Sequence, residues 1–135
     1  MSDGDLVLRP IGTVQSPLTD LATAPKQEAE GAPQAWLVFD PAVRDGLDDL
    51  RAGDRVIVLT WLHHSERDVL KVHPRSDPAI PLTGVFSTRS PARPNPIGLH
   101  EVQILEVDGA RVRVDALEAL DGTPVLDVKP VLRPG

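Results

Sequence analysis

Three prolines within six residues, Pro91, Pro94 and Pro96, constrain the fold of this chain more than any other feature of its sequence. They lie in the stretch from Gly84 to His100, which reads Gly-Val-Phe-Ser-Thr-Arg-Ser-Pro-Ala-Arg-Pro-Asn-Pro-Ile-Gly-Leu-His. Each proline fixes its own φ and favours extended backbone at the residue before it. We therefore expect a stiff, extended loop here, which loses little conformational entropy when a ligand binds to it.

The polar side chains of this loop allow two interpretations. Arg89, Arg93 and Asn95 on a rigid backbone suit a pre-organised ligand site. The alternative is a proline-rich turn whose arginines are simply solvated, because loops collect both functional residues and spare charges. Local chemistry alone does not decide between them. Immediately before the loop, Gly84 to Phe86 is expected to end a buried strand.

Short apolar segments separated by proline and glycine turns recur along the whole chain. We expect strands at residues 6–14, 35–40, 55–62, 68–73, 97–107, 111–114 (continued by 116–120) and 125–128. Asp108-Gly109 and Asp121-Gly122 are typical tight turns. Residues 41–50 are expected to form a short helix, with Val43, Leu47 and Leu50 on one face. The pattern predicts a mainly β fold class: a small closed antiparallel β-barrel with one or two short helices and long loops.

Composition excludes several classes of function. The only aromatic residues are two tryptophans and two phenylalanines, which disfavours a single-stranded nucleic-acid binder built on stacking platforms. A net charge of −6 disfavours a broad electrostatic grip on nucleic acid, although residues 84–98 hold two arginines and no acidic residue. Without cysteine, the chain has no disulfides, thiolate metal sites or cysteine nucleophiles. Neither a signal peptide nor a membrane span is visible, so we expect a cytoplasmic protein.

Four clusters of residues are suited to chemistry. They are Pro25-Lys26-Gln27, His63-His64, Arg89 with Arg93 and Asn95, and the turn Asp121-Gly122-Thr123-Pro124, followed by Asp127 and Lys129, which are expected to form an ion pair. Adjacent histidines on a strand point to opposite faces, so we expect no metal site. Neither a nucleophile elbow nor a GxGxxG motif is present, which disfavours a hydrolase and a Rossmann-type cofactor site.

Taken together, these clusters resemble the TsaA-like, or TrmO, family of S-adenosylmethionine-dependent methyltransferases. The resemblance covers nearly the whole chain in the same order. It is carried by Ile-Gly-Thr-Val-Gln-Ser-Pro at 11–17, Pro-Lys-Gln at 25–27, Gly-Val-Phe-Ser-Thr-Arg at 84–89, Arg-Pro-Asn-Pro-Ile-Gly at 93–98 and Asp-Gly-Thr-Pro-Val-Leu-Asp-Val-Lys-Pro at 121–130.

The resemblance implies a small barrel enzyme that methylates N6 of threonylcarbamoyladenosine beside the anticodon of certain tRNAs. It also implies a homodimer with the cofactor pocket near the subunit interface. The residues implied to contact S-adenosylmethionine are Pro25, Lys26, Gln27, His63, His64, Arg89, Leu99, Asp121, Gly122, Thr123 and Pro124. His63 and Asp121 are candidates for the base that removes a proton from the acceptor nitrogen.

Two departures from the family pattern bear on the substrate. Val131 follows Lys129-Pro130 where the family has a tyrosine, and residues 1–135 are expected to form one domain without the C-terminal extension of longer members. With the acidic balance, these departures keep two alternatives open. One is an S-adenosylmethionine-dependent methyltransferase that acts on a small molecule or another RNA. The other is a non-catalytic module that binds S-adenosylmethionine.

Overall fold

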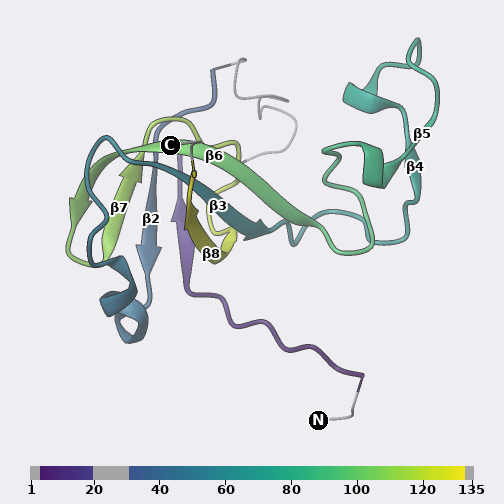
Figure 1. The fold of residues 1–135 in the computed structure, drawn as a ribbon. Coiled ribbons are helices and arrows are strands. Elements are labelled where there is room, and N and C mark those ends of the chain that lie inside the picture. The colour runs from purple at the N-terminus through teal and green to yellow at the C-terminus, as the bar shows by residue number, and fades with distance from the viewer. Residues whose placement is uncertain (1–3, 20–30, 133–135) are drawn as a thin grey trace.

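Six strands form a closed barrel in the computed structural model, which describes residues 4–19 and 31–132 (Figure 1). All neighbouring strands are antiparallel, in the order β1-β2-β7-β6-β3-β8. The strands are β1 (Gly12–Gln15), β2 (Ala35–Phe39), β3 (Arg55–Trp61), β6 (Ile97–Asp108), β7 (Arg111–Val114) and β8 (Pro124–Pro130). The predicted small antiparallel β-barrel is therefore confirmed.

Alternation of apolar residues along each strand fills the inside of the barrel. On β3, Val56, Val58 and Thr60 are buried while the residues between them are partly exposed, as the period of two in a strand requires. β6 follows the same rule with Val102 and Ile104. The core consists of Val14, Ala35, Leu37, Phe39, Leu47, Val56, Val58, Val102, Ile104, Val112, Val114, Leu117, Ala119 and Val125.

β6 is the longest strand, and it joins the two sides of the barrel. Its first part pairs with β3, from Ile97 opposite Trp61 to Gln103 opposite Arg55. Its second part pairs with β7 and ends in the hairpin at Gly109, whose φ of +60° confirms the predicted turn. β3 in turn pairs with β8, with a bulge between Leu59 and Thr60.

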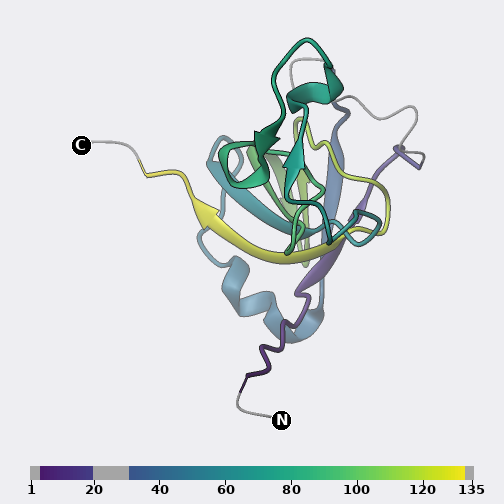
Figure 2. The same ribbon diagram turned by 90° about the vertical axis from the view of Figure 1, so that its right-hand side faces the viewer.

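A long excursion between β3 and β6 stands to one side of the barrel (Figures 1 and 2). It contains a separate two-stranded sheet, β4 (Lys71–Val72) with β5 (Thr83–Gly84). Two short 3-10 helices lie beside this sheet, η3 (Pro74–Ser76) and η4 (Val85–Ser87). Since both strands are only two residues long, the predicted strand at residues 68–73 is confirmed only at its end.

The predicted helix at residues 41–50 forms as the 3-10 helix η2 (Pro41–Leu47). The Asp40 carboxylate accepts a hydrogen bond from the amide of Ala42 at 2.9 Å, which caps the first turn. Pro41 occupies a position that suits it, because its missing N–H has no partner there anyway. Leu47 is buried in the core, so the predicted apolar face is correct.

Two sequence predictions about strands are wrong in part. β1 begins only at Gly12, and Leu6 in the segment before it is 94% exposed. Pro10, which has no N–H to donate to a ladder, lies between them. Phe86 does not end a buried strand but lies in η4 and is 79% exposed, while Val85 beside it is buried.

Residues 116–120 do not continue β7. Leu117 and Ala119 are buried on alternate positions, which imitates the pattern of a strand. However, its main-chain hydrogen bonds are not those of a strand ladder: the amide of Leu117 donates to the carbonyl of Pro33 at 3.0 Å, and the carbonyl of Leu120 accepts from the amide of Thr123 at 3.1 Å. The segment is an extended connection that covers one end of the barrel.

In the described part of the chain, no helix is long and apolar enough to cross a membrane.

The contact of β1 with β2 yields a stability prediction at Gly12. A Cβ there would lie 2.5 Å from the carbonyl oxygen of Val38, a backbone atom that cannot rotate away. We expect Gly12→Ala to lower the free energy of unfolding by about 2 kcal/mol or more, measured by urea denaturation. Gly46→Ala is the control, because a Cβ at Gly46 meets nothing within 4 Å. Equal stability of the two variants would contradict the prediction.

Candidate functional site

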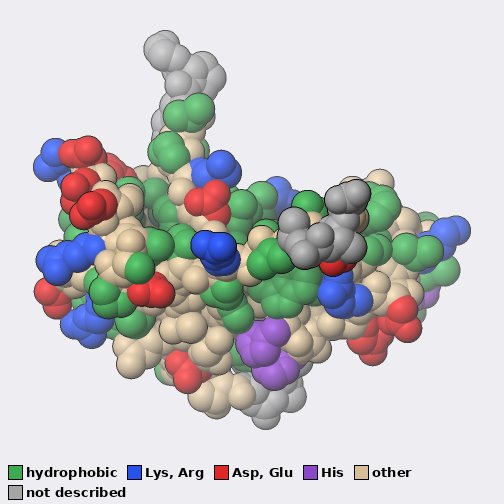
Figure 3. Space-filling model, turned by 90° about the horizontal axis from the view of Figure 1, so that it is seen from below, with side chains coloured by type: hydrophobic (Ala, Val, Ile, Leu, Met, Phe, Trp, Pro, Cys, Tyr) green, Lys and Arg blue, Asp and Glu red, His purple; other side chains and the backbone are tan. Residues whose placement is uncertain are grey.

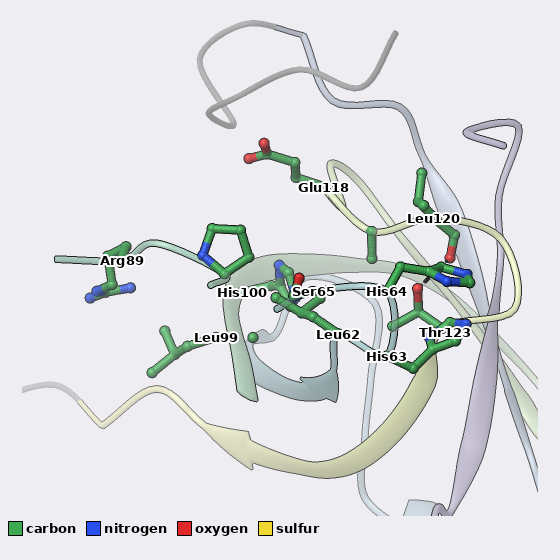
Figure 4. A pocket seen from close by; sticks show the side chains of 13 residues that line it. Leu62, His63, His64, Ser65, Arg89, Leu99, His100, Glu118, Leu120 and Thr123 are labelled. Atoms are coloured by element: carbon green, nitrogen blue, oxygen red, sulfur yellow. Dashed lines mark hydrogen bonds between the residues drawn. The ribbon is translucent and has the colours of Figure 1, made fainter. Parts of the chain in front are cut away.

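A cavity of about 340 Å³ lies at one end of the barrel, where three strand ends meet (Figure 4). β3 ends at Trp61, directly opposite the first residue of β6, Ile97. β8 begins at the same end, because Val125 pairs with Thr60. The cavity is lined by Leu62, His63, His64, Ser65, Arg89, Pro91, Gly98, Leu99, His100, Glu118, Ala119, Leu120 and Thr123. Its volume lies in the range of small-molecule sites.

His63 and His64 lie in a turn that follows β3, and both line the cavity. The turn is closed by hydrogen bonds from His63 N to Trp61 O and from Ser65 N to Leu62 O, each 2.9 Å long. The two ring centroids are 3.9 Å apart. The prediction that these side chains point to opposite faces is therefore wrong, because the strand has already ended and its alternation no longer applies.

The proline-rich loop is stiffened by an internal arginine. Arg93 donates from Nε to the carbonyl oxygen of Ser90 at 2.7 Å, and from its guanidinium to those of Val85 at 2.7 Å and Thr88 at 2.5 Å. Three carbonyls from one short segment thus converge on one cation. Arg93 braces the loop and takes no part in the cavity wall.

A second arginine fastens the other end of the same loop. Arg67 donates to the carbonyl of Pro94 at 2.8 Å and to the side chain of Asn95 at 3.0 Å, and it lies 5.1 Å above the ring of Trp61. Arg89 is different. It is exposed at the edge of the cavity, and no residue in the described ranges 4–19 and 31–132 forms a hydrogen bond or ion pair with it. Its guanidinium is available for an anionic group.

Thr60 and His100 form a buried polar pair, of which His100 lines the cavity. Their Oγ1 and Nε2 atoms are 2.9 Å apart, and both side chains are buried. The pair is possible because of Gly98, which lies opposite Thr60 on β6 and two residues before His100. A Cβ at Gly98 would lie 2.7 Å from His100 Nε2 and still closer to Thr60 Oγ1. Glycine at this position thus provides space for a hydrogen bond between neighbouring strands.

Burial lowers the pKa of His100 to about 4, because the charged imidazolium would lose its hydration. The imidazole is therefore neutral at pH 7. A neutral ring has one nitrogen that carries hydrogen and one that accepts, so it can form hydrogen bonds but cannot hold an extra proton there.

The turn at Asp121 supplies one cavity residue. Thr123 is buried, lines the cavity and donates to the carbonyl of Leu120 at 2.6 Å. Asp121, by contrast, accepts a hydrogen bond from the amide of Ser16 at 3.0 Å. It fastens the chain after β1 and is not among the residues that line the cavity. Gly122 and Pro124 are likewise outside the lining, and the φ of Gly122 is +84°.

The structure brings five of the candidate cofactor residues to one cavity: His63, His64, Arg89, Leu99 and Thr123. Asp121, Gly122 and Pro124 adjoin it. Pro25, Lys26 and Gln27 lie outside the described residues. Among residues 4–19 and 31–132, no three or more histidines, cysteines or acidic residues are grouped to hold a metal ion. The contacts of the candidate cofactor residues with S-adenosylmethionine remain predictions.

Sequence reasoning missed the remaining lining residues: Leu62, Ser65, Pro91, Gly98, His100, Glu118, Ala119 and Leu120. His100 carried a usable signal. It falls at an inward position of β6, two residues before Val102, and a histidine inside a barrel needs a polar partner. Segment 118–120 carried none, because its alternation was indistinguishable from that of a strand.

Two further predicted features lie on β8. Lys129 Nζ is 3.6 Å from Asp127 Oδ2, so the predicted ion pair is confirmed. Val131, the position of the tyrosine in the family pattern, donates its amide to Arg55 O at 3.1 Å. Arg55 begins β3, so Val131 lies at the opposite end of the barrel from the cavity.

Comparisons with known proteins relate the chain to one family. The family model described as "tRNA-methyltransferase O N-terminal domain" matches residues 13–134. A "Probable S-adenosyl-L-methionine-binding protein" of Methanothermobacter thermautotrophicus is 45% identical over 130 residues, 96% of this chain and 93% of the relative. An "S-adenosyl-L-methionine-binding protein" of Archaeoglobus fulgidus is 44% identical over 125 residues, 92% and 88% of the two chains.

Solved structures show the same fold. A crystal structure of TrmO from Pseudomonas aeruginosa superposes with a TM-score of 0.75 at 27% identity. It covers 95% of this chain, and the chain spans 56% of that protein. Another TrmO crystal structure gives a TM-score of 0.75 at 31% identity, with 95% and 58% covered. The chain thus spans little more than half the length of these solved relatives.

The buried imidazole predicts a pH dependence of stability. The unfolded chain protonates His100 near pH 6.5, whereas the folded chain does so only near pH 4. The stabilising contribution is therefore complete above pH 6.5, falls as the pH drops and is lost below about pH 4. Urea denaturation should show that the native chain loses up to about 3 kcal/mol more across this window than His100→Gln. Parallel curves for the two proteins would contradict the low pKa.

Proposed function

Because this chain belongs to the tRNA-methyltransferase O N-terminal domain family, we propose that it is an S-adenosylmethionine-dependent methyltransferase. The methyl acceptor we propose is N6 of threonylcarbamoyladenosine in tRNA. One observation carries the proposal: residues from four separate segments of the chain line a single cavity. Five of these residues are the ones that the family pattern connects with the cofactor.

The chemistry of the cavity fits S-adenosylmethionine. The guanidinium of Arg89, which pairs with none of the described residues, suits the α-carboxylate, because charge-assisted hydrogen bonds to carboxylates are strong. Leu62, Leu99 and Leu120 provide apolar surface for the adenine ring. The volume of about 340 Å³ is at the lower end of the range for small-molecule binding sites. Residues 25–27, which lie outside the described part, are proposed to complete the contacts.

When bound, S-adenosylmethionine supplies an activated methyl group. Transfer needs the acceptor atom, the methyl carbon and the sulfur in line, so the main task of the protein is positioning. The bonds of Arg93 and Arg67 hold the loop of Arg89 in place before a ligand arrives. This arrangement keeps the entropic cost of binding low.

The acceptor nitrogen must also lose a proton. His100 is a poor base for this step, because its neutral form has little affinity for a proton at pH 7. His63 is exposed and lines the cavity, whereas Asp121 is engaged with the amide of Ser16. These positions favour His63 over Asp121 as the base.

A homodimer is the proposed assembly, and the protein is proposed to act in the cytoplasm. The excursion between β3 and β6 exposes three large apolar side chains, Leu70, Leu82 and Phe86. Leu99 at the cavity is also 46% exposed. Apolar side chains of this kind, exposed on the excursion and at the cavity, support a subunit interface close to the site.

One observation favours a different acceptor. The net charge is −6, and the surface in Figure 3 shows acidic and basic side chains interspersed around the histidine cluster, not a continuous basic area. Proteins that bind RNA, a polyanion, usually do so through a continuous basic surface. The second candidate function is therefore methylation of a small molecule or another RNA. A non-catalytic S-adenosylmethionine-binding module is the third.

Removal of the Arg89 side chain tests the cofactor site. We expect Arg89→Ala to weaken the binding of S-adenosylmethionine by about 10- to 100-fold in calorimetry, because a charge-assisted bond is lost. Arg51→Ala is the control, since Arg51 is an exposed arginine far along the chain, after η2, that does not line the cavity. Unchanged affinity of Arg89→Ala would reject its role, and no binding by the native protein would reject all three functions.

Mass spectrometry of nucleosides tests the acceptor. tRNA from a strain that lacks the protein should contain threonylcarbamoyladenosine without the N6 methyl group, and the methylated form should return when the gene is restored. Restoration with Arg89→Ala should return less of it. If the methylated nucleoside is undiminished in the deletion strain, the tRNA assignment is wrong and a small acceptor becomes the leading candidate.

A further inference from the structure

His100 has one nitrogen that the protein fold does not use. Nε2 is 2.9 Å from Thr60 Oγ1, and no other hydrogen bond to the ring exists within the described residues. No enclosed side-chain nitrogen or oxygen in that part of the chain lacks a hydrogen-bond partner. Nδ1 has no partner, so it cannot be enclosed. Since His100 is only 8% exposed and lines the cavity, Nδ1 faces the cavity.

The surroundings of the ring select an uncharged ligand group. Ala119, Leu62 and Leu120 line the same cavity, whereas the guanidinium of Arg89 lies on the other side of the His100 ring from Thr123 and His63 in Figure 4. A neutral imidazole among apolar neighbours pairs with a neutral polar group more readily than with a charged one. The carboxylate end of a ligand thus belongs with Arg89, and the uncharged end with His100.

Thr60 determines what Nδ1 offers to a ligand. If the Thr60 hydroxyl donates to Nε2, the ring proton lies on Nδ1, which then donates. If Nε2 donates to Thr60, Nδ1 accepts. Both forms are neutral, and both keep the 2.9 Å pair intact. A hydroxyl or an adenine edge can be bound in either form.

We propose that His100 is a ligand-binding residue that forms one uncharged hydrogen bond, through Nδ1, with the nucleoside half of the ligand, and that Thr60 is its positioning residue. The proposal rests on the proposed S-adenosylmethionine site and assigns each half of the ligand to a different residue. Arg89 binds the amino-acid half, and His100 selects the ribose or adenine.

Two substitutions distinguish the contribution of Nδ1 of His100 from that of Nε2. Asparagine carries its polar atoms at the distance of Nδ1 from the main chain, and glutamine carries them at the distance of Nε2. We expect His100→Asn to bind S-adenosylmethionine within about threefold of the native protein. We expect His100→Gln to keep the bond to Thr60 yet to bind about tenfold more weakly, because the cavity contact is lost.

A nucleoside that lacks the amino acid tests whether His100 and Arg89 bind different halves of the ligand. With 5′-methylthioadenosine as the probe, His100→Gln should lose the same factor of about ten, whereas Arg89→Ala should bind like the native protein. Equal affinity of His100→Gln and the native protein for both probes would overturn the proposal. It would leave the proposed S-adenosylmethionine site intact, because that site is rejected by a different result, the failure of the native protein to bind S-adenosylmethionine.

Nitrogen NMR of the native protein provides a readout independent of the variants. The Nδ1 resonance of His100 should shift when 5′-methylthioadenosine is added, while the ring remains neutral. If both substitutions disturb folding, this measurement still decides: an unchanged Nδ1 resonance at saturating probe overturns the proposal. Equal weakening in both variants with an unchanged resonance indicates a purely structural role and also overturns it.

Discussion

The antiparallel pairing of β3 with β6 is the constraint on which the rest of the structure depends. It extends over seven residue pairs, from Arg55 opposite Gln103 to Trp61 opposite Ile97. It brings the end of one strand and the beginning of the other to the same end of the barrel, although 35 residues separate Trp61 from Ile97 in the chain. Everything in that interval, including the loop of Arg89, must start and finish beside the cavity.

Rigidity of the loop comes from arginines as much as from prolines. Prolines restrict φ, but they leave carbonyl oxygens without ladder partners, and those groups need donors. Arg93 satisfies three carbonyls and Arg67 a fourth, so two cations do the work that a strand partner would do elsewhere. Of these three neighbouring arginines, Arg67 and Arg93 thus bind the loop itself, whereas Arg89 pairs with no residue in the described part of the chain and is available for a ligand.

Much of this architecture could be predicted from the sequence, and the failures have a common physical cause. Period-two burial located β2, β3, β6 and β7 closely, because each has one face in the core. The same period misled at residues 116–120, where burial alternates without a neighbouring strand. Of the five predicted residues that line the cavity, His63, His64, Arg89 and Thr123 lie outside the strands, and Leu99 lies on β6. The inward position of His100 on β6 was a usable signal, but its pairing with Thr60 depends on strand register, which no local pattern of residue types reveals.

The register also explains why a polar pair is tolerated inside the barrel. A buried hydroxyl or imidazole costs free energy unless it is hydrogen-bonded, and each of these two side chains supplies the partner of the other. Gly98 gives them room, and Nδ1 of His100 faces the cavity with no hydrogen-bond partner among the described residues. A purely structural pair could have been replaced by two apolar side chains at little cost. The free nitrogen at the cavity wall is what an apolar replacement would remove, so a role in binding accounts for the pair better than stability does.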